Sequence, residues 1–149
     1  MGNSPISNCS FRLRKDVMLS SHLNIKVHTK RRRYILVVDD DRDVLLFLED
    51  RLNALGYDVL TATNGQEGLE VLQYQSVDGV LLDLQMPVMG GMAFLEKLGG
   101  SSATLPVIVM SATEYRSELF QAILKGATDF LIKPIAQDKL TSKCFQLFQ

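Results

Sequence analysis

Short strand-like runs alternate with helical patterns from Tyr34 to the end of the chain, and this alternation constrains the fold more than any other feature. The strand-like runs lie at residues 34–38, 58–62, 79–82, 107–110 and 129–133. The helical patterns lie at about 42–55, 65–74, 91–98, 115–125 and 136–148. Wholly apolar runs of four or five residues are typical of strands buried on both faces. The pattern therefore predicts a parallel sheet with helices on both sides.

The number of strands and the handedness of their connections predict one topology. Crossovers between parallel strands are right-handed, and 2-1-3-4-5 is the natural doubly wound order for a small sheet. We therefore expect an α/β fold, a doubly wound (βα)5 domain with a five-stranded parallel sheet in the order 2-1-3-4-5. In that order the first and third strands are neighbours, and ligands bind beyond their carboxyl ends.

Carboxylates follow these two neighbouring strands at the points where the strands end. Asp39, Asp40 and Asp41 come directly after the first strand, and Asp83 comes directly after the third. Like charges about 4 Å apart repel by about 4 kcal/mol at an effective dielectric constant of about 20. The cluster therefore predicts a bound divalent cation. Mg²⁺ suits such a site, because it takes oxygen ligands and leaves room for water and a phosphate oxygen.

Two further strand ends supply complementary groups. Ser111 follows the fourth strand, and Lys133 closes the fifth. Three carboxylates and one ammonium group sum to about −2, so Lys133 cannot neutralise the pocket alone. A metal, a lysine and a hydroxyl around an exposed carboxylate predict a phosphoryl-transfer site in which one aspartate is the nucleophile.

Each of these residues also has a structural alternative. Asp39–Asp41 can cap the following helix, since Asp is favourable at a helix start. Asp83 can be an ordinary loop acid, and Phe130 alone fits a core position on a strand. The strand ends taken together favour a functional site.

The first 33 residues form a basic arm on an acidic body. Residues 1–33 carry eight Lys and Arg against one acid (+7), and residues 34–149 carry 8 basic and 16 acidic residues (−8). We divide the chain into a disordered arm, 1–33, and one domain, 34–149. The arm is also similar in composition to an organellar transit peptide, and Met18 is an alternative start, which would make the residues before it untranslated upstream sequence. We do not expect nucleic-acid binding through the arm.

Other features favour a soluble, cytoplasmic protein. Cys9 and Cys144 have no metal-ligand spacing and do not suggest a disulfide framework. No apolar stretch approaches membrane-spanning length, and the start lacks the features of a secretory signal and of myristoylation. We therefore expect no membrane contact.

Four motifs occur in order along the body of the chain. They are Val38-Asp39-Asp40, the run 82–87, Met110-Ser111-Ala112 and the run 126–134. Over residues 34–149 they resemble the receiver domain of two-component response regulators. The resemblance implies the flavodoxin-like (βα)5 fold and a phosphoryl-accepting signalling switch in a two-component or phosphorelay system. Such a domain is not a conventional enzyme, because it catalyses only its own phosphorylation and dephosphorylation.

The resemblance implies a role for each acid. Asp83 would be the phosphoacceptor and would take its phosphoryl group from a histidine kinase or a phosphotransfer protein. Asp40 and Asp83 would ligate Mg²⁺ directly, together with the backbone carbonyl of Gln85. Asp39 would orient metal-bound water.

The resemblance also implies a switch. Lys133, with a cis bond to Pro134, would pair with the phosphoryl group. The Ser111 hydroxyl would turn to a phosphoryl oxygen, and Phe130 would move into the space vacated, as a bistable packing element. The face formed by about 115–148 would then change its affinity for a downstream target protein or for a second copy in a homodimer.

A few positions depart from the family pattern or vary within it. Gly90 stands where an Asp is usual, and Asp41 adds a third acid to the usual pair. Gln85 and Thr113 occupy the two variable positions that tune the lifetime of the acyl phosphate.

Other functions compete with this hypothesis. Asp39-Asp40-Asp41 contains the D-x-D of haloacid-dehalogenase phosphatases, in which Asp39 would be the nucleophile, but residues 110–114 lack the late acidic pair and there is no cap domain. A receiver-like binding module that works unphosphorylated is a further alternative, which the filled acceptor and metal positions disfavour. Because the chain ends with the last helix, we expect a stand-alone switch without an output domain.

Overall fold

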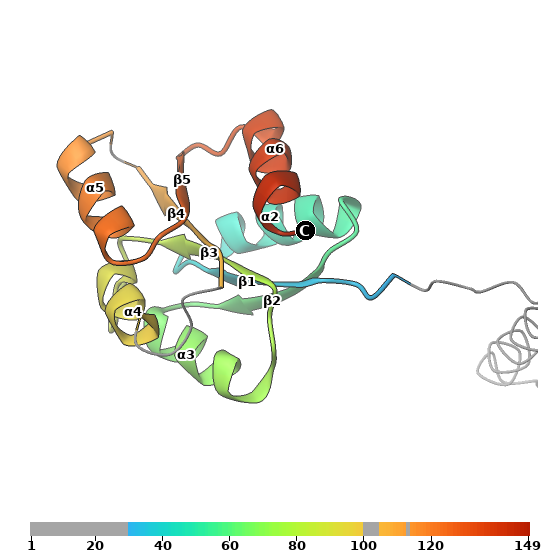
Figure 1. Cartoon of the computed structure of the whole chain (residues 1–149), viewed down its shortest axis with the longest axis horizontal. Coiled ribbons are helices and arrows are strands. Elements are labelled where there is room, and N and C mark those ends of the chain that lie inside the picture. Colours follow the sequence, from blue (N-terminus) through green and yellow to red (C-terminus); the bar gives the residue numbers. More distant parts are fainter. Residues whose placement is uncertain (1–29, 100–104, 113) are drawn as a thin grey trace, which may run out of the picture. The chain divides into compact units, whose positions relative to one another are not determined.

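The computed structural model describes residues 30–99, 105–112 and 114–149. Its helices and strands are labelled in Figure 1. In chain order they are β1 (Tyr34–Val38), α2 (Arg42–Ala54), β2 (Asp58–Ala62), α3 (Gly65–Tyr74), β3 (Gly79–Asp83), α4 (Gly91–Leu98), β4 (Val107–Ser111), α5 (Arg116–Leu124), β5 (Asp129–Ile132) and α6 (Gln137–Leu147). Every predicted strand and helix of the body is present. The expected disorder of the arm concerns residues that lie largely outside the described ones.

The sheet has the predicted topology. Its five strands are parallel and lie in the order β2-β1-β3-β4-β5. Val38, the last residue of β1, is in register with Ala62 of β2 and with Leu82 of β3. The residues that follow Val38 and Leu82 therefore emerge side by side at the carboxyl edge of the sheet.

Two hydrophobic cores explain why the central strands are apolar throughout. Ile35 and Val37 pack in one core with α2 and α6, whereas Leu36 and Val38 pack in the other with α3, α4 and α5. All four side chains are fully buried. Figure 1 shows the same division, with α2 and α6 on one side of the sheet and the other three helices on the opposite side. A strand between two cores cannot alternate polar and apolar residues.

Local signals set the helix ends at several points. Asp41 is the N-cap of α2, and its side chain accepts a hydrogen bond from the Asp43 amide at 2.9 Å. Asn64 caps α3 in the same way through the Glu67 amide. Gly56 and Gly126, with φ of 94° and 109°, follow the ends of α2 and α5 in the left-handed region that glycine adopts without strain. The capping alternative is therefore the correct one for Asp41.

The amino edge of the sheet carries two ion pairs. Arg32 pairs with Asp58 at 3.2 Å, and Arg33 pairs with Asp78 at 3.8 Å. Asp78 also accepts the Tyr34 amide at 2.9 Å. Both arginines belong to the stretch assigned to the basic arm, yet each contacts an acid of the domain.

None of the helices in the described ranges combines the length and the apolarity needed to cross a bilayer.

Candidate functional site

The carboxylates after β1 and at the end of β3 converge. Asp39, Asp40 and Asp83 each offer an oxygen, and these three oxygens lie within 4.8 Å of one another. Asp39 is fully buried, Asp83 is 4% exposed and Asp40 is exposed. Asp83 is thus less exposed than the sequence predicted, because it is the last residue of β3, whose five residues are all buried. The pairing of Val38 with Leu82 brings the acids together, as the strand order predicted.

Lys133 reaches this cluster from the end of β5. Its Nζ lies 2.7 Å from Asp39 Oδ2 and 3.3 Å from Asp83 Oδ1. Burial lowers the pKa of Lys133, but the hydrogen bond to Asp39 and the charges of both acids outweigh burial, so the net pKa is raised. The lysine therefore stays charged. The bond between Lys133 and Pro134 is cis, as expected.

The Asp83 carboxylate carries an unbalanced charge. Burial is the largest cause that raises its pKa, to about 6, and the nearby Asp39 raises it further. Lys133 and the Gln85 amide, which donates to Asp83 Oδ1 at 3.4 Å, oppose the shift without cancelling it. A single lysine therefore does not compensate the acids of the pocket.

Asp39 is held from several sides. Its amide donates to the Ala62 carbonyl at 3.0 Å, its Oδ1 accepts the Asp41 amide at 2.9 Å, and its Oδ2 accepts Lys133. Both carboxylate oxygens of Asp39 thus already accept a hydrogen bond. These bonds fix the orientation of the carboxylate, which suits a residue that would orient metal-bound water.

The donor set fits Mg²⁺. The cluster offers carboxylate oxygens from three residues, and the described residues that form it include no sulfur or imidazole ligand. Asp40 is exposed, so that side of the cluster is open to water. Hard oxygen ligands with retained waters are what Mg²⁺ prefers.

Comparison with known proteins identifies the family. A sequence model of the response regulator receiver domain matches residues 35–145. The chain belongs to this family. Receiver domains are phosphoryl-accepting signalling switches rather than classical enzymes, and they interact with histidine kinases and downstream effectors.

Individual relatives support the same assignment. A probable transcriptional regulator, ycf27, from Cyanidium caldarium is 33% identical over 76% of this chain and 45% of its own length. The transcriptional regulatory protein PrrA from Mycobacterium tuberculosis is 36% identical over 73% of this chain and 47% of its own. This chain thus spans less than half the length of these relatives.

Solved receiver structures have the same fold. The receiver domain of the Francisella response regulator 1452 has a TM-score of 0.74 at 27% identity, covering 78% of this chain and 97% of its own. Chemotaxis protein CheY4 of Vibrio cholerae has a TM-score of 0.75 at 26% identity, covering 78% and 99%.

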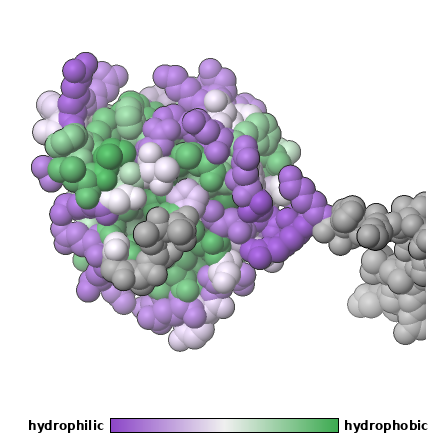
Figure 2. Space-filling view, viewed as in Figure 1, coloured by the Kyte–Doolittle hydropathy of each residue, from purple (hydrophilic) through white to green (hydrophobic). Residues whose placement is uncertain are grey.

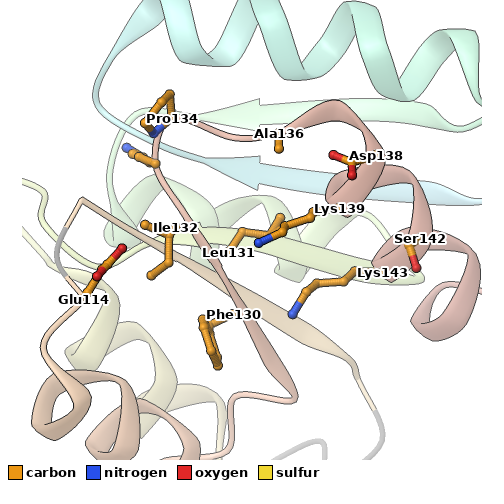
Figure 3. Close-up of a pocket in the computed structure, with 11 residues that line it drawn as sticks. Glu114, Phe130, Leu131, Ile132, Pro134, Ala136, Asp138, Lys139, Ser142 and Lys143 are labelled. Atoms are coloured by element: carbon orange, nitrogen blue, oxygen red, sulfur yellow. The ribbon is translucent and has the colours of Figure 1, made fainter.

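The two residues expected to form the switch occupy different environments in this receiver domain. Ser111 ends β4 and is fully buried, and its carbonyl accepts the Lys133 amide at 2.8 Å. Phe130 is 38% exposed, so it does not occupy the core position that its strand sequence also allowed. The Nζ of Lys143 lies 4.9 Å from the centre of the Phe130 ring, and Figure 3 shows the Lys143 side chain extending toward that residue.

A cavity and an apolar patch lie on the receiver face formed by α5, β5 and α6. The cavity has a volume of about 760 Å³, and Phe130, Lys133 and Lys143 are among its lining residues. Figure 2 shows a hydrophobic area over α5. Its exposed apolar residues include Phe120, Ile123 and Leu124.

The loop between β3 and α4 contains a turn that the sequence did not reveal. Val88 has a φ of 68°, and the Met89 amide donates to the Pro87 carbonyl at 2.8 Å. This is a γ-turn of the rare, strained form. The Val88 side chain is 86% exposed, while the Met89 carbonyl accepts the Gly65 amide at 2.9 Å. A Cβ at position 65 would lie 2.8 Å from that carbonyl, so glycine is needed for this close approach.

Sequence reasoning also missed Glu118. The Gln85 side chain donates from Nε2 to Glu118 Oε1 at 2.7 Å, which joins the loop after β3 to α5. Glu118 stands in the first turn of α5 and lies at no strand end. The strand-end pattern that found the other residues therefore could not find it.

Proposed function

We propose that Asp83 is the phosphoacceptor of this receiver domain and that a histidine kinase or phosphotransfer protein supplies the phosphoryl group. The convergence of three acids with Lys133 at one edge of the sheet is the observation that supports it. The Gln85 amide and the Lys133 Nζ both contact the Asp83 carboxylate at Oδ1. We assign the attack to Oδ2, which forms a bond to phosphorus as the bond from phosphorus to the donor imidazole breaks. The imidazole nitrogen keeps the electron pair.

Three groups of this chain would hold Mg²⁺. They are the carboxylates of Asp40 and Asp83 and the backbone carbonyl of Gln85, while Asp39 would orient a bound water. When bound, the ion neutralises the carboxylates and the oxygens of the transferred group. Lys133 would pair with a phosphoryl oxygen, and its contact with Asp39 keeps it charged and in position.

Phosphorylation would be read out by the face formed by α5, β5 and α6. The Ser111 hydroxyl would turn toward the phosphoryl group, and Phe130 would leave its partly exposed position for the space vacated. The cavity and the apolar patch of this face would bind a downstream target or a second copy of the chain. Residues 34–149 form the unit that would carry this activity. This unit would catalyse only its own phosphorylation and dephosphorylation. We expect the protein in the cytoplasm.

Phosphorylation by acetyl phosphate in the presence of Mg²⁺ tests the proposal. The wild-type chain should gain one phosphoryl group, detected by intact mass, and Asp83→Asn should gain none. Phosphorylation of the Asp83→Asn chain would contradict the assignment. If the wild-type chain gains none, the unphosphorylated binding module is the better explanation.

The phosphatase alternative loses support at one residue. A D-x-D nucleophile motif needs its second acid at the site, but the Asp41 side chain caps α2 through the Asp43 amide.

A further inference from the structure

Gln85 makes two contacts that connect the phosphoacceptor to α5. Its backbone amide donates to Asp83 Oδ1 at 3.4 Å, and its side-chain Nε2 donates to Glu118 Oε1 at 2.7 Å. Gln85 lies in the loop after β3, and Glu118 lies 33 residues further along the chain in the first turn of α5. One residue therefore joins the acid at the reaction centre to a helix of the face that would be read by partners.

We propose that Glu118 is a positioning residue that holds the Gln85 side chain away from the phosphoryl group, so that release of this bond is coupled to phosphorylation. The inference deepens the proposed function and rests on it. The side-chain amide of Gln85 is the donor that moves, and the Glu118 carboxylate is the acceptor that competes with the phosphoryl group for it.

The competition follows from charge. A carboxylate offers a single negative charge, whereas a phosphoryl group carries about −1.5 to −2 and has three strong acceptor oxygens. Hydrogen bonds to charged acceptors are the stronger ones. After phosphorylation two strong acceptors, the Glu118 carboxylate and the phosphoryl group, are therefore available to the side-chain amide of Gln85. Before phosphorylation Glu118 holds it, as observed. Whatever weakens the Glu118 bond therefore favours the phosphorylated state, and the coupling is reciprocal.

The second connection of α5 differs in kind. Lys125, the C-cap residue of α5, pairs with Glu96 of α4. One contact therefore holds each end of α5. Of these two contacts, the one at the first turn involves Gln85, which is also bonded to Asp83. Loss of the Gln85–Glu118 hydrogen bond would free the first turn of α5, while the Lys125–Glu96 pair would still hold the other end.

A double-mutant cycle with beryllofluoride and Mg²⁺, a stable mimic of the phosphoryl group, tests this inference on the full chain. The four proteins are the wild type, Glu118→Ala, Gln85→Ala and the double variant, and calorimetry gives the affinities. Glu118→Ala should bind beryllofluoride about three- to tenfold more tightly, which is the effect of removing one competing hydrogen bond. In the Gln85→Ala background the same substitution should change nothing.

Three comparisons separate positioning from a general structural effect. Glu118→Gln keeps an acceptor oxygen but loses the charge, so its affinity should lie between those of the wild type and Glu118→Ala. Glu70→Ala removes the same charge from an exposed position on α3 and should also leave the affinity unchanged. The lifetime of the acyl phosphate should lengthen in Glu118→Ala and not in the double variant.

The possible results distinguish failure of this inference from failure of the proposed function. Equal affinity in Glu118→Ala and wild type, or an equal gain with and without Gln85, would overturn the inference and leave the proposed function intact. Absence of beryllofluoride binding in the wild-type chain would overturn both.

Discussion

The two edges of the sheet carry the same kinds of residue in opposite balance. At the amino edge Asp58 and Asp78 each have an arginine partner. At the carboxyl edge Asp39, Asp40 and Asp83 lie together, and one lysine, Lys133, pairs with Asp39 and Asp83. The pKa of Asp83 is raised to about 6. Paired acids at the amino edge serve the fold. The acids at the carboxyl edge keep an uncompensated negative charge that a bound cation would neutralise, and this imbalance marks the site.

Replacing Lys133 should have the largest effect. In metal-free protein Lys133→Met leaves Asp39 and Asp83 buried without their cation, a change that costs about 3–5 kcal/mol of unfolding free energy. Urea denaturation at pH 7 with a chelator measures it. Lys143→Met, which removes a more exposed pair with Asp129, should cost less than about 1 kcal/mol. Equal losses of unfolding free energy in the two variants would mean that the acids of the carboxyl edge do not depend on Lys133 for charge compensation.

Removing the phosphoacceptor charge should stabilise the metal-free protein. The pKa of Asp83 is raised to about 6 in the folded chain, against about 3.9 for an ordinary Asp. A raised acid binds its proton more tightly when folded, so ionisation costs stability as pH rises from about 4 to about 6. Relative to wild type, Asp83→Asn should gain about 3 kcal/mol across that window and keep the gain above it. Denaturation of both proteins between pH 4 and 8 measures the difference, which Mg²⁺ should reduce.

A flat difference between the two proteins over this pH range would contradict the account of the Asp83 environment.

The amino edge should respond with the opposite sign. Asp78→Ala removes the acceptor of the Tyr34 amide and the partner of Arg33. We expect a loss of about 1–2 kcal/mol, the cost of leaving a partly buried donor unsatisfied. Urea denaturation with and without Mg²⁺ should give the same loss, because the cluster of acids that could hold an ion, among the residues the structure describes, lies at the other edge. A gain in stability, as expected for Asp83→Asn, would mean that the acids of the two edges do not differ in their contribution to folding.

Backbone strain also lies near the functional edge. Val88 is the one non-glycine residue with positive φ in the described ranges, and its exposed side chain gains little from the fold. Asn tolerates this region better than a β-branched residue, so Val88→Asn should add about 0.5–1 kcal/mol of stability. Thermal unfolding measures the gain. A loss would mean that the valine side chain makes a stabilising contact.

The smallest effect belongs to Arg32. Its side chain is 59% exposed in the pair with Asp58. Exposed pairs contribute little, so Arg32→Ala should change the unfolding free energy by less than about 0.5 kcal/mol, and less still at high salt. Urea denaturation at two salt concentrations checks this. A larger loss would give the basic run a structural role beyond the ion pair.

Most of the fold was predictable because a strand between two helical layers has to be apolar on both faces. Val37 and Val38 face different cores, and no polar residue could replace either without a partner. The site was predictable for a related reason. Strand order places the ends of β1 and β3 together, so acids at those ends had to meet.

Other features depend on tertiary geometry that no periodicity encodes. Asp41 follows the same strand as Asp39 and Asp40 but caps α2, because the direction of the chain after β1 decides where its side chain lies. Glu118 meets Gln85 only through the way in which α5 lies beside the loop after β3. The turn at Val88 has a residue that disfavours it, so local sequence gave no signal.

The most direct test is to locate the phosphoryl group. The full chain is phosphorylated with acetyl phosphate and Mg²⁺, the acyl phosphate is reduced with borohydride, and the modified residue is identified by peptide mass spectrometry. We predict reduction at Asp83 alone, and none when Mg²⁺ is removed. Modification at Asp39 or Asp40, or modification that does not depend on Mg²⁺, would contradict this prediction.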